Sequence, residues 1–142
     1  MSQVIIYTDP TYGVVVCIPS GEIPIAEVQT KDVPAGLVSE IIDKSTLPSD
    51  TRFQEAWEWA GTGNPVVENL AKVKIKAIEL LKAEATRSAL AAQKAEMLFE
   101  TNPYSTTEIR DAYLACKSDI QNATVVSTAQ HCLNSFTTTY GV

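Results

Sequence analysis

Few side chains in this sequence have the chemistry of a catalyst. The single histidine, His131, precedes Cys132, and Cys116 lies sixteen residues before Cys132, so two facing helices can bring a thiol close to an imidazole. This pairing leaves a small thiol enzyme as one alternative. With Cys17, the three thiols and the imidazole match the ligand count of a zinc site, but no Cys-x-x-Cys or His-x-x-x-His spacing is present. Because Cys116 and Cys132 lie on apolar stripes, we expect them in the core, with no metal and no cofactor.

The remaining polar groups also predict no enzyme. Glu55 and Glu58 flank Trp57 and can in principle form an acid–base pair, but nothing in the sequence indicates a substrate cleft around them. Four lysines between residues 72 and 82 are interleaved with glutamates, a pattern typical of a salt-bridged helix surface. The sequence has neither a Gly-x-Ser-x-Gly elbow nor a glycine-rich phosphate loop. We therefore predict no catalytic residues.

Composition and charge narrow the class of partner. The 142 residues are 45% hydrophobic and 20% charged, which are globular proportions for about one domain. Eleven basic and seventeen acidic residues give a net charge of −6, which argues against nucleic acid as a partner because phosphates need a basic face. Residues 1–7 have no basic region and are predicted as a strand rather than a signal peptide. We expect synthesis in a cytoplasm, reduced cysteines and no membrane partner.

The predicted fold class is α+β, with a small N-terminal antiparallel β unit, a long α-helix and a C-terminal helical hairpin. Residues 1–63 form the strand-rich unit, which we expect to dock on a neighbour because three short strands bury little by themselves. The β-branched runs at residues 4–7 and 14–18 predict a hairpin, since Asp, Pro and Gly lie between them. Residues 38–43 are a third strand candidate, and residues 23–29 are either a short helix or an irregular crossing.

An aromatic cluster follows the predicted strands. Asp50 or Ser49 can cap a short helix that starts directly after them. Phe53 and Trp57 are four residues apart and are expected on one face of that helix, whereas Trp59 falls off this face. Tryptophan is common both at interface hot spots and in protein cores. The sequence leaves both interpretations open, with Trp59 the more exposed member.

Residues 64–102 carry the clearest helix signal. Asn64 as N-cap and Pro65 in the first turn predict the start, and Asn102 with Pro103 predicts the end. Between residues 66 and 100 there is no Gly or Pro, and Ala, Leu, Lys and Glu dominate. Apolar residues recur at helical spacing at Val67, Ala71, Ile78, Leu81, Ala85, Ala89, Ala92, Ala95 and Phe99.

Residues 103–142 are predicted to form two shorter helices. Ser105 and Glu108 have capping-box spacing at the start of the first. An apolar stripe over residues 109–120 predicts the first helix, and a second stripe over residues 125–136 predicts the second. The last six residues are expected to fray or to form a short extended piece.

The predicted long helix is too long for the rest of the chain to cover. From residue 65 to 100 it would measure about 54 Å, whereas a compact chain of this size has a radius of gyration of about 14–15 Å. The helix therefore either breaks near residues 83–85 or extends and is covered by another chain. We predict homo-oligomer packing along it, in an irregular bundle rather than a regular coiled coil. The interface candidates are Phe53, Trp57, Trp59, Ile78, Leu81, Ala85, Ala89, Ala92 and Phe99.

Three motifs in a fixed order resemble a family of small tailed-bacteriophage proteins that are usually encoded among tail and tail-fibre genes. The motifs are DVPAG at residues 32–36, LPSDTRFQEAW at residues 47–57 (similar to a DLPxDRxFRxAW pattern), and a Lys/Ala-rich helix that starts as NLAKVK at residues 69–74. The resemblance covers roughly residues 3–80. Two departures are Gln54, where a basic residue is common, and the missing arginine-rich continuation of the helix beyond Arg87.

The resemblance implies a virion or assembly component and supplies no enzymatic residues. We therefore expect a non-enzymatic structural protein of a tailed phage, associated with the tail or tail fibre and localised to the virion. Its expected partners are other phage structural proteins and further copies of itself. An assembly chaperone of the tail fibre, absent from the mature particle, and a head-decoration protein are the alternatives.

Overall fold

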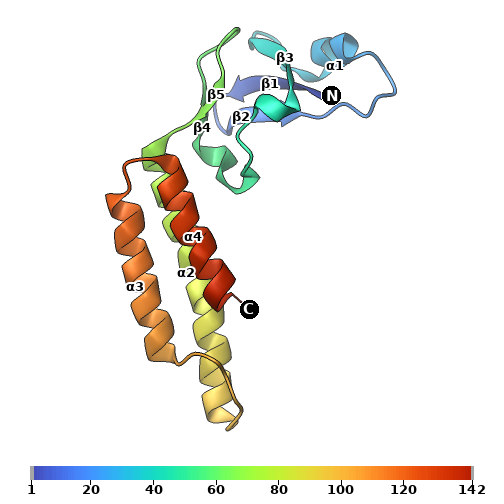
Figure 1. Ribbon diagram of the computed structural model, residues 1–142. Helices are drawn as coiled ribbons and strands as arrows, with labels where there is room; N and C mark the ends of the chain where they lie inside the picture. Colours follow the sequence, from blue (N-terminus) through green and yellow to red (C-terminus); the bar gives the residue numbers. More distant parts are fainter. Residues whose placement is uncertain (1, 142) are drawn as a thin grey trace. The chain divides into compact units, whose positions relative to one another are not determined.

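The structure is a computed structural model that describes residues 2–141 (Figure 1). It confirms the predicted α+β class, with antiparallel strands first and helices towards the C-terminus. The chain divides into two compact units, one that ends at Asn69 and one that begins at Leu70. In the described part of the chain, no helix is both long enough and apolar enough to cross a membrane.

A three-stranded antiparallel sheet forms the first unit's largest element. The strands β1 (Gln3–Asp9), β2 (Gly13–Cys17) and β3 (Ser39–Asp43) are arranged in the order β2-β1-β3. The Asp9 carboxylate accepts the backbone N–H groups of Thr11 and Tyr12 at 2.7 and 3.0 Å, which fixes the predicted hairpin turn. All three predicted strands are confirmed.

The ambiguous segment before β3 is a short helix, α1 (Ile25–Asp32). One side-chain hydrogen bond ties it to the sheet, from the Gln29 amide to the Ser39 hydroxyl at 2.9 Å. After β3 come two 3₁₀ turns, η1 (Lys44–Thr46) and η2 (Thr51–Ala56). Asp50 caps η2 as predicted, because its carboxylate accepts the backbone N–H of Arg52 at 3.2 Å.

The start predicted for the long helix is wrong. Residues 66–68 form a strand, β5 (Val66–Glu68), that pairs antiparallel with β4 (Trp57–Trp59). Pro65 lacks a backbone N–H, so it can precede a strand as well as open a helix. Trp59 lies opposite Val66, and both pack with Trp57 in one apolar cluster, which favours the strand pair.

The second unit is a bundle of three antiparallel helices. These are α2 (Leu70–Met97), α3 (Thr106–Asn122) and α4 (Val126–Tyr140), and Figure 1 shows them side by side. Helix α2 has 28 residues and is about 42 Å long. Its buried residues are Val73, Ala77, Leu81, Ser88, Ala92 and Ala95.

The premise that another chain must cover the long helix is therefore wrong. Helix α2 does not break near residues 83–85, and α3 and α4 both pack against it and bury one of its faces. The helix predicted from residue 65 to 100 was eight residues too long, and the C-terminal segment holds more helix than expected. Homo-oligomer formation stays a prediction, but copies of the chain would have to meet at a surface other than the buried face of α2.

Side-chain hydrogen bonds cap α3 and join the ends of neighbouring helices. The Ser105 hydroxyl accepts the backbone N–H of Glu108 at 3.2 Å, which confirms the predicted cap of α3. The Lys74 ammonium donates to the carbonyl of Gln121 in the last turn of α3 at 3.0 Å. The buried Ser88 hydroxyl donates to the carbonyl of Tyr140.

The expectation of a frayed or extended C-terminal tail is wrong as far as Tyr140. Helix α4 continues through this residue, and the Tyr140 ring packs against Phe136 at 5.1 Å and against Tyr104 at 4.6 Å between ring centroids. Aromatic packing therefore stabilises a last turn that is rich in threonine, a weak helix former.

Candidate functional site

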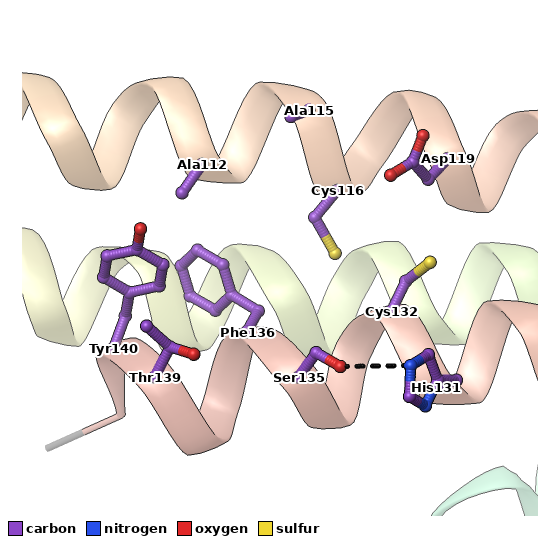
Figure 2. Close-up of a pocket in the computed structure, with 10 residues that line it drawn as sticks. All are labelled: Ala112, Ala115, Cys116, Asp119, His131, Cys132, Ser135, Phe136, Thr139 and Tyr140. Carbon is purple, nitrogen blue, oxygen red and sulfur yellow. Dashed lines mark hydrogen bonds between the residues drawn. The ribbon is translucent and has the colours of Figure 1, made fainter.

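A groove between α3 and α4 collects most of the side chains that carry chemistry. It has a volume of about 430 Å³ and opens to solvent. Figure 2 shows its lining residues on the two antiparallel helices. They are Ala112, Ala115, Cys116 and Asp119 on α3, and His131, Cys132, Ser135, Phe136, Thr139 and Tyr140 on α4.

The structure brings the three predicted thiol-site residues of the helical unit into this groove. Cys116 is buried and Cys132 is half-buried, as expected for cysteines on apolar stripes, while His131 is exposed. The expected third thiol, Cys17, lies on β2 in the other unit. Among the residues that the structure describes, no cluster of three His, Cys, Asp or Glu side chains has an arrangement that can hold a metal ion.

The electrostatics of the groove keep both thiols protonated at neutral pH. Burial, with smaller contributions from the neighbouring Cys132 and Asp119, raises the pKa of the Cys116 thiol to about 11. Burial and the Asp119 carboxylate also raise the pKa of Cys132. The thiolate is the nucleophilic form of cysteine, so these shifts oppose the thiol-enzyme alternative.

His131 makes its one described side-chain hydrogen-bond contact within its own helix. Its Nε2 atom lies 3.4 Å from the Ser135 hydroxyl oxygen, one turn along α4, as the dashed line in Figure 2 shows. This is a long contact between two exposed groups, so it orients the imidazole weakly. The pairing does not activate Cys132, whose pKa is raised rather than lowered.

A second candidate site is the apolar tip, which we define as residues 97–99 at the end of α2. Its side chains Met97, Leu98 and Phe99 are 76%, 53% and 98% exposed. Phe99 has a φ of 53°, in the left-handed region that favours glycine.

Backbone hydrogen bonds hold Phe99 in this conformation. The N–H of Glu100 donates to the carbonyl of Ala95 at 2.8 Å, and the N–H of Phe99 donates to the carbonyl of Glu96 at 3.4 Å. This bond pair is the Schellman cap, in which glycine normally occupies the left-handed position. The cap therefore fixes the backbone of Phe99 at the end of the helix, where its ring lies in solvent.

Of the nine predicted interface residues, Phe99 is the one that the structure leaves fully exposed. Phe53, Trp57, Leu81 and Ala92 are buried in the cores of their own units and are not available to a partner. The partly buried candidates are Trp59, Ile78, Ala85 and Ala89. Trp59 packs against a cluster of Ile6, Val14, Trp57 and Val66, and its indole N–H donates to the carbonyl of Asn64 at 3.1 Å.

The alanine stripe, which is the part of the predicted apolar recurrence at Ala85, Ala89, Ala92 and Ala95, is not a continuous exposed seam, because Ala92 and Ala95 are buried. Ala85 and Ala89 line a groove of about 270 Å³ between α2 and α3, together with Ile109 and Tyr113. The predicted stripe was centred about one residue position away from the buried face. Val73, Ala77 and Ser88 were missed for this reason, although all three recur at helical spacing with Leu81 and Ala92.

Sequence reasoning also missed Asp119 and Ser135 in the groove between α3 and α4. Asp119 lies one turn after Cys116, and Ser135 lies one turn after Cys132, and all four line the groove. The three-residue spacing in both pairs was a usable signal, because residues three apart share a helix face.

Comparison with known proteins adds no assignment. No family model matches this sequence, no curated protein matches it, and no solved structure matches it. Fold and site define an α+β chain of two units, and function has to be inferred from its residues and geometry.

Proposed function

We propose that this chain is a non-enzymatic structural component of a tailed-phage virion, associated with the tail or tail fibre, that acts through protein–protein contacts. The order of motifs at residues 32–36, 47–57 and 69–74 supports the phage assignment by resemblance. Two compact units in one short chain also suit a connecting part, because each unit offers its own docking surface.

The apolar tip is the observation that carries this proposal. Three consecutive large apolar side chains are exposed there, and one of them occupies a strained backbone position. A non-glycine residue in the left-handed region costs of order 1 kcal/mol or more in folding free energy. Within its own unit the exposed Phe99 ring recovers none of this cost, so contact with another molecule accounts for its presence.

We propose that copies of the chain, or a copy and a fibre protein, meet at this tip. The buried candidates Leu81 and Ala92 are excluded from such a contact, which moves the homo-oligomer interface from the alanine stripe to the end of α2. The first unit has ten acids and three bases up to residue 69, a net charge of −7, whereas the second has a net charge of +1. This charge suits a basic neighbour for the first unit.

Mass spectrometry of purified particles tests the phage assignment. We expect the chain in mature virions at a fixed copy number relative to the tail proteins. Its absence from virions, together with copurification with a fibre protein from infected cells, would support the assembly chaperone instead. A copy number that matches the head proteins would support the head-decoration alternative. Absence from both samples contradicts the phage proposal.

Light scattering on the purified protein tests the contact surface. We expect concentration-dependent self-association that Phe99→Ala weakens at least tenfold, because the ring is the largest exposed apolar group at the tip. Leu114→Ala is the matched control, since Leu114 is an exposed apolar residue on α3 away from the tip. If the wild-type protein is a strict monomer, binding to the fibre protein is measured with the same two variants. No binding in either assay removes the tip as an interface.

The remote thiol-enzyme alternative is tested separately. It requires Cys132, whose substitution by alanine leaves the proposed structural role intact. Cys132→Ala protein that still enters particles and self-associates like the wild type argues against this alternative.

A further inference from the structure

We propose that Cys116 and Cys132 are a disulfide-forming pair that can cross-link α3 to α4. This pair is a modification site in the helical unit, and it does not depend on the proposed function. Neither residue has a role in the apolar tip or in the sheet unit.

Position along the helical hairpin places the two cysteines opposite each other. Cys116 and Cys132 each lie eight residues from Thr124, in the turn between α3 and α4. In two antiparallel helices joined by a short turn, residues equally far from the turn lie at the same level. Figure 2 shows the two side chains directed towards the gap between the helices, one from each side.

The side chains around the pair allow a close approach of the helices. Ala112, Ala115 and Ser135 line the same groove and are small. Packed helices have interaxial distances of about 8–10 Å, and Cα atoms lie about 2.3 Å from each axis, so directly facing Cα atoms lie about 3.4–5.4 Å apart. The upper part of this range overlaps the Cα separation of protein disulfides, about 4.4–6.8 Å.

Electrostatic coupling gives a second sign of proximity. The Cys132 thiol contributes to the raised pKa of Cys116, as expected for two thiols that share one groove. Both cysteines are unbonded in this structure, so the cross-link is a state that the chain reaches by oxidation.

The reaction needs an external oxidant, and a low-molecular-weight disulfide such as oxidised glutathione provides it. The Cys132 thiol, the more accessible of the two, loses its proton and attacks one sulfur of the oxidant, which releases one glutathione thiolate. The Cys116 thiol then loses its proton and attacks the Cys132 sulfur, which releases the second glutathione thiolate. One protein disulfide forms, two protein thiols are oxidised, and one glutathione disulfide is reduced to two thiols. The open groove of about 430 Å³ gives the first adduct room next to Cys132.

The cross-link would join two helices across the turn and restrict the unfolded helical unit. A loop of about 15 residues closed in this way is stabilised markedly against unfolding. We expect the melting temperature of the helical unit to rise by roughly 10 °C on oxidation.

Peptide mapping after treatment with oxidised glutathione tests the proposal on the wild-type chain. We expect loss of two hydrogens from the intact mass and a linked peptide pair that contains Cys116 and Cys132. Cys17→Ser is the matched control and should react identically, because Cys17 is not part of the pair.

The single variants Cys116→Ser and Cys132→Ser separate the steps. Cys116→Ser should stop at a glutathione adduct on Cys132, and Cys132→Ser should react much more slowly. Two outcomes overturn the proposal: stable glutathione adducts on both cysteines of the wild type without a linked pair, or a main disulfide that includes Cys17. Mapping of the wild type remains decisive if either variant folds poorly.

Discussion

Phe99 and Cys116 show how single residues define the two candidate sites. Phe99 takes a position in a helix cap that glycine normally occupies, and its ring has almost no cover. Cys116 is the opposite case, a titratable group whose burial raises its pKa to about 11. Each residue departs from the state that it would adopt in an unfolded chain, and each departure can be measured.

Two substitutions at Phe99 separate the effect of its backbone conformation from the effect of its side chain. Phe99→Gly should raise the free energy of unfolding by about 0.5–1 kcal/mol, because glycine adopts a positive φ without strain. Phe99→Ala keeps the strain and should show no such gain. Urea denaturation of both variants checks this prediction, and equal stability of the two variants would contradict it. Both variants should lose association at the apolar tip.

The pKa of Cys116 predicts a loss of stability at alkaline pH. In the folded state the pKa of Cys116 is about 11, which is above the ordinary thiol value of 9.0 that applies in the unfolded chain. Folding therefore favours the protonated thiol. This contribution is complete below pH 9 and is lost as the pH rises from 9 to about 11. Unfolding free energies at pH 8 and pH 10.5, measured under reducing conditions, should fall more for the wild type than for Cys116→Ser. The same decrease in both proteins would place the effect on other groups.

At the scale of elements, local pattern predicted most helices and strands but not their junctions. The hairpin of β1 and β2, the strand β3 and the cap of α3 follow from short-range signals such as Asp9, Gly13 and Ser105. The segment 64–69 carries helix-start signals, yet β5 forms there because β4 provides a partner strand. Cross-strand pairing is a contact across the chain, which a local pattern does not report.

Ser88 makes a contact between two helices that a local sequence pattern also does not report. A polar serine breaks an apolar pattern, yet its hydroxyl donates to the carbonyl of Tyr140 and holds the last turn of α4 against α2. Ser88→Ala should lower the stability of the helical unit by about 1–2 kcal/mol, since it removes this hydrogen bond and leaves the partly buried Tyr140 carbonyl without this donor. Hydrogen exchange should become faster in the last turn of α4. Ser127→Ala, at an exposed position of the same helix, should change neither quantity appreciably.

At the scale of the whole molecule, the chain consists of two units with separate cores. Both tryptophans belong to the first unit, while α2, α3 and α4 form the second. Tryptophan fluorescence therefore reports the first unit, and circular dichroism at 222 nm reports mainly the second. Independent cores allow each unit to unfold by its own transition.

Leu81→Ala tests this independence. Leu81 is fully buried in the helical bundle, and its truncation should destabilise that unit by about 2–5 kcal/mol. We expect the transition measured by circular dichroism to move to lower denaturant while the fluorescence transition stays in place. Coincident movement of both transitions would show that the units unfold as one. The conservative exchange Leu81→Met is the control and should shift the first transition only slightly.

The sequence by itself determined the α+β class, the strands β1, β2 and β3, and the three helices of the second unit apart from the start of α2. These follow from hydrophobic periodicity, capping residues and turn residues, which act over a few positions. Tertiary structure alone decided where α2 begins, that α3 and α4 cover it, and that Phe99 rather than Leu81 or Ala92 faces solvent. Those outcomes depend on which distant surfaces pack together, and the free energy of that packing comes from contacts that no local stretch of sequence contains.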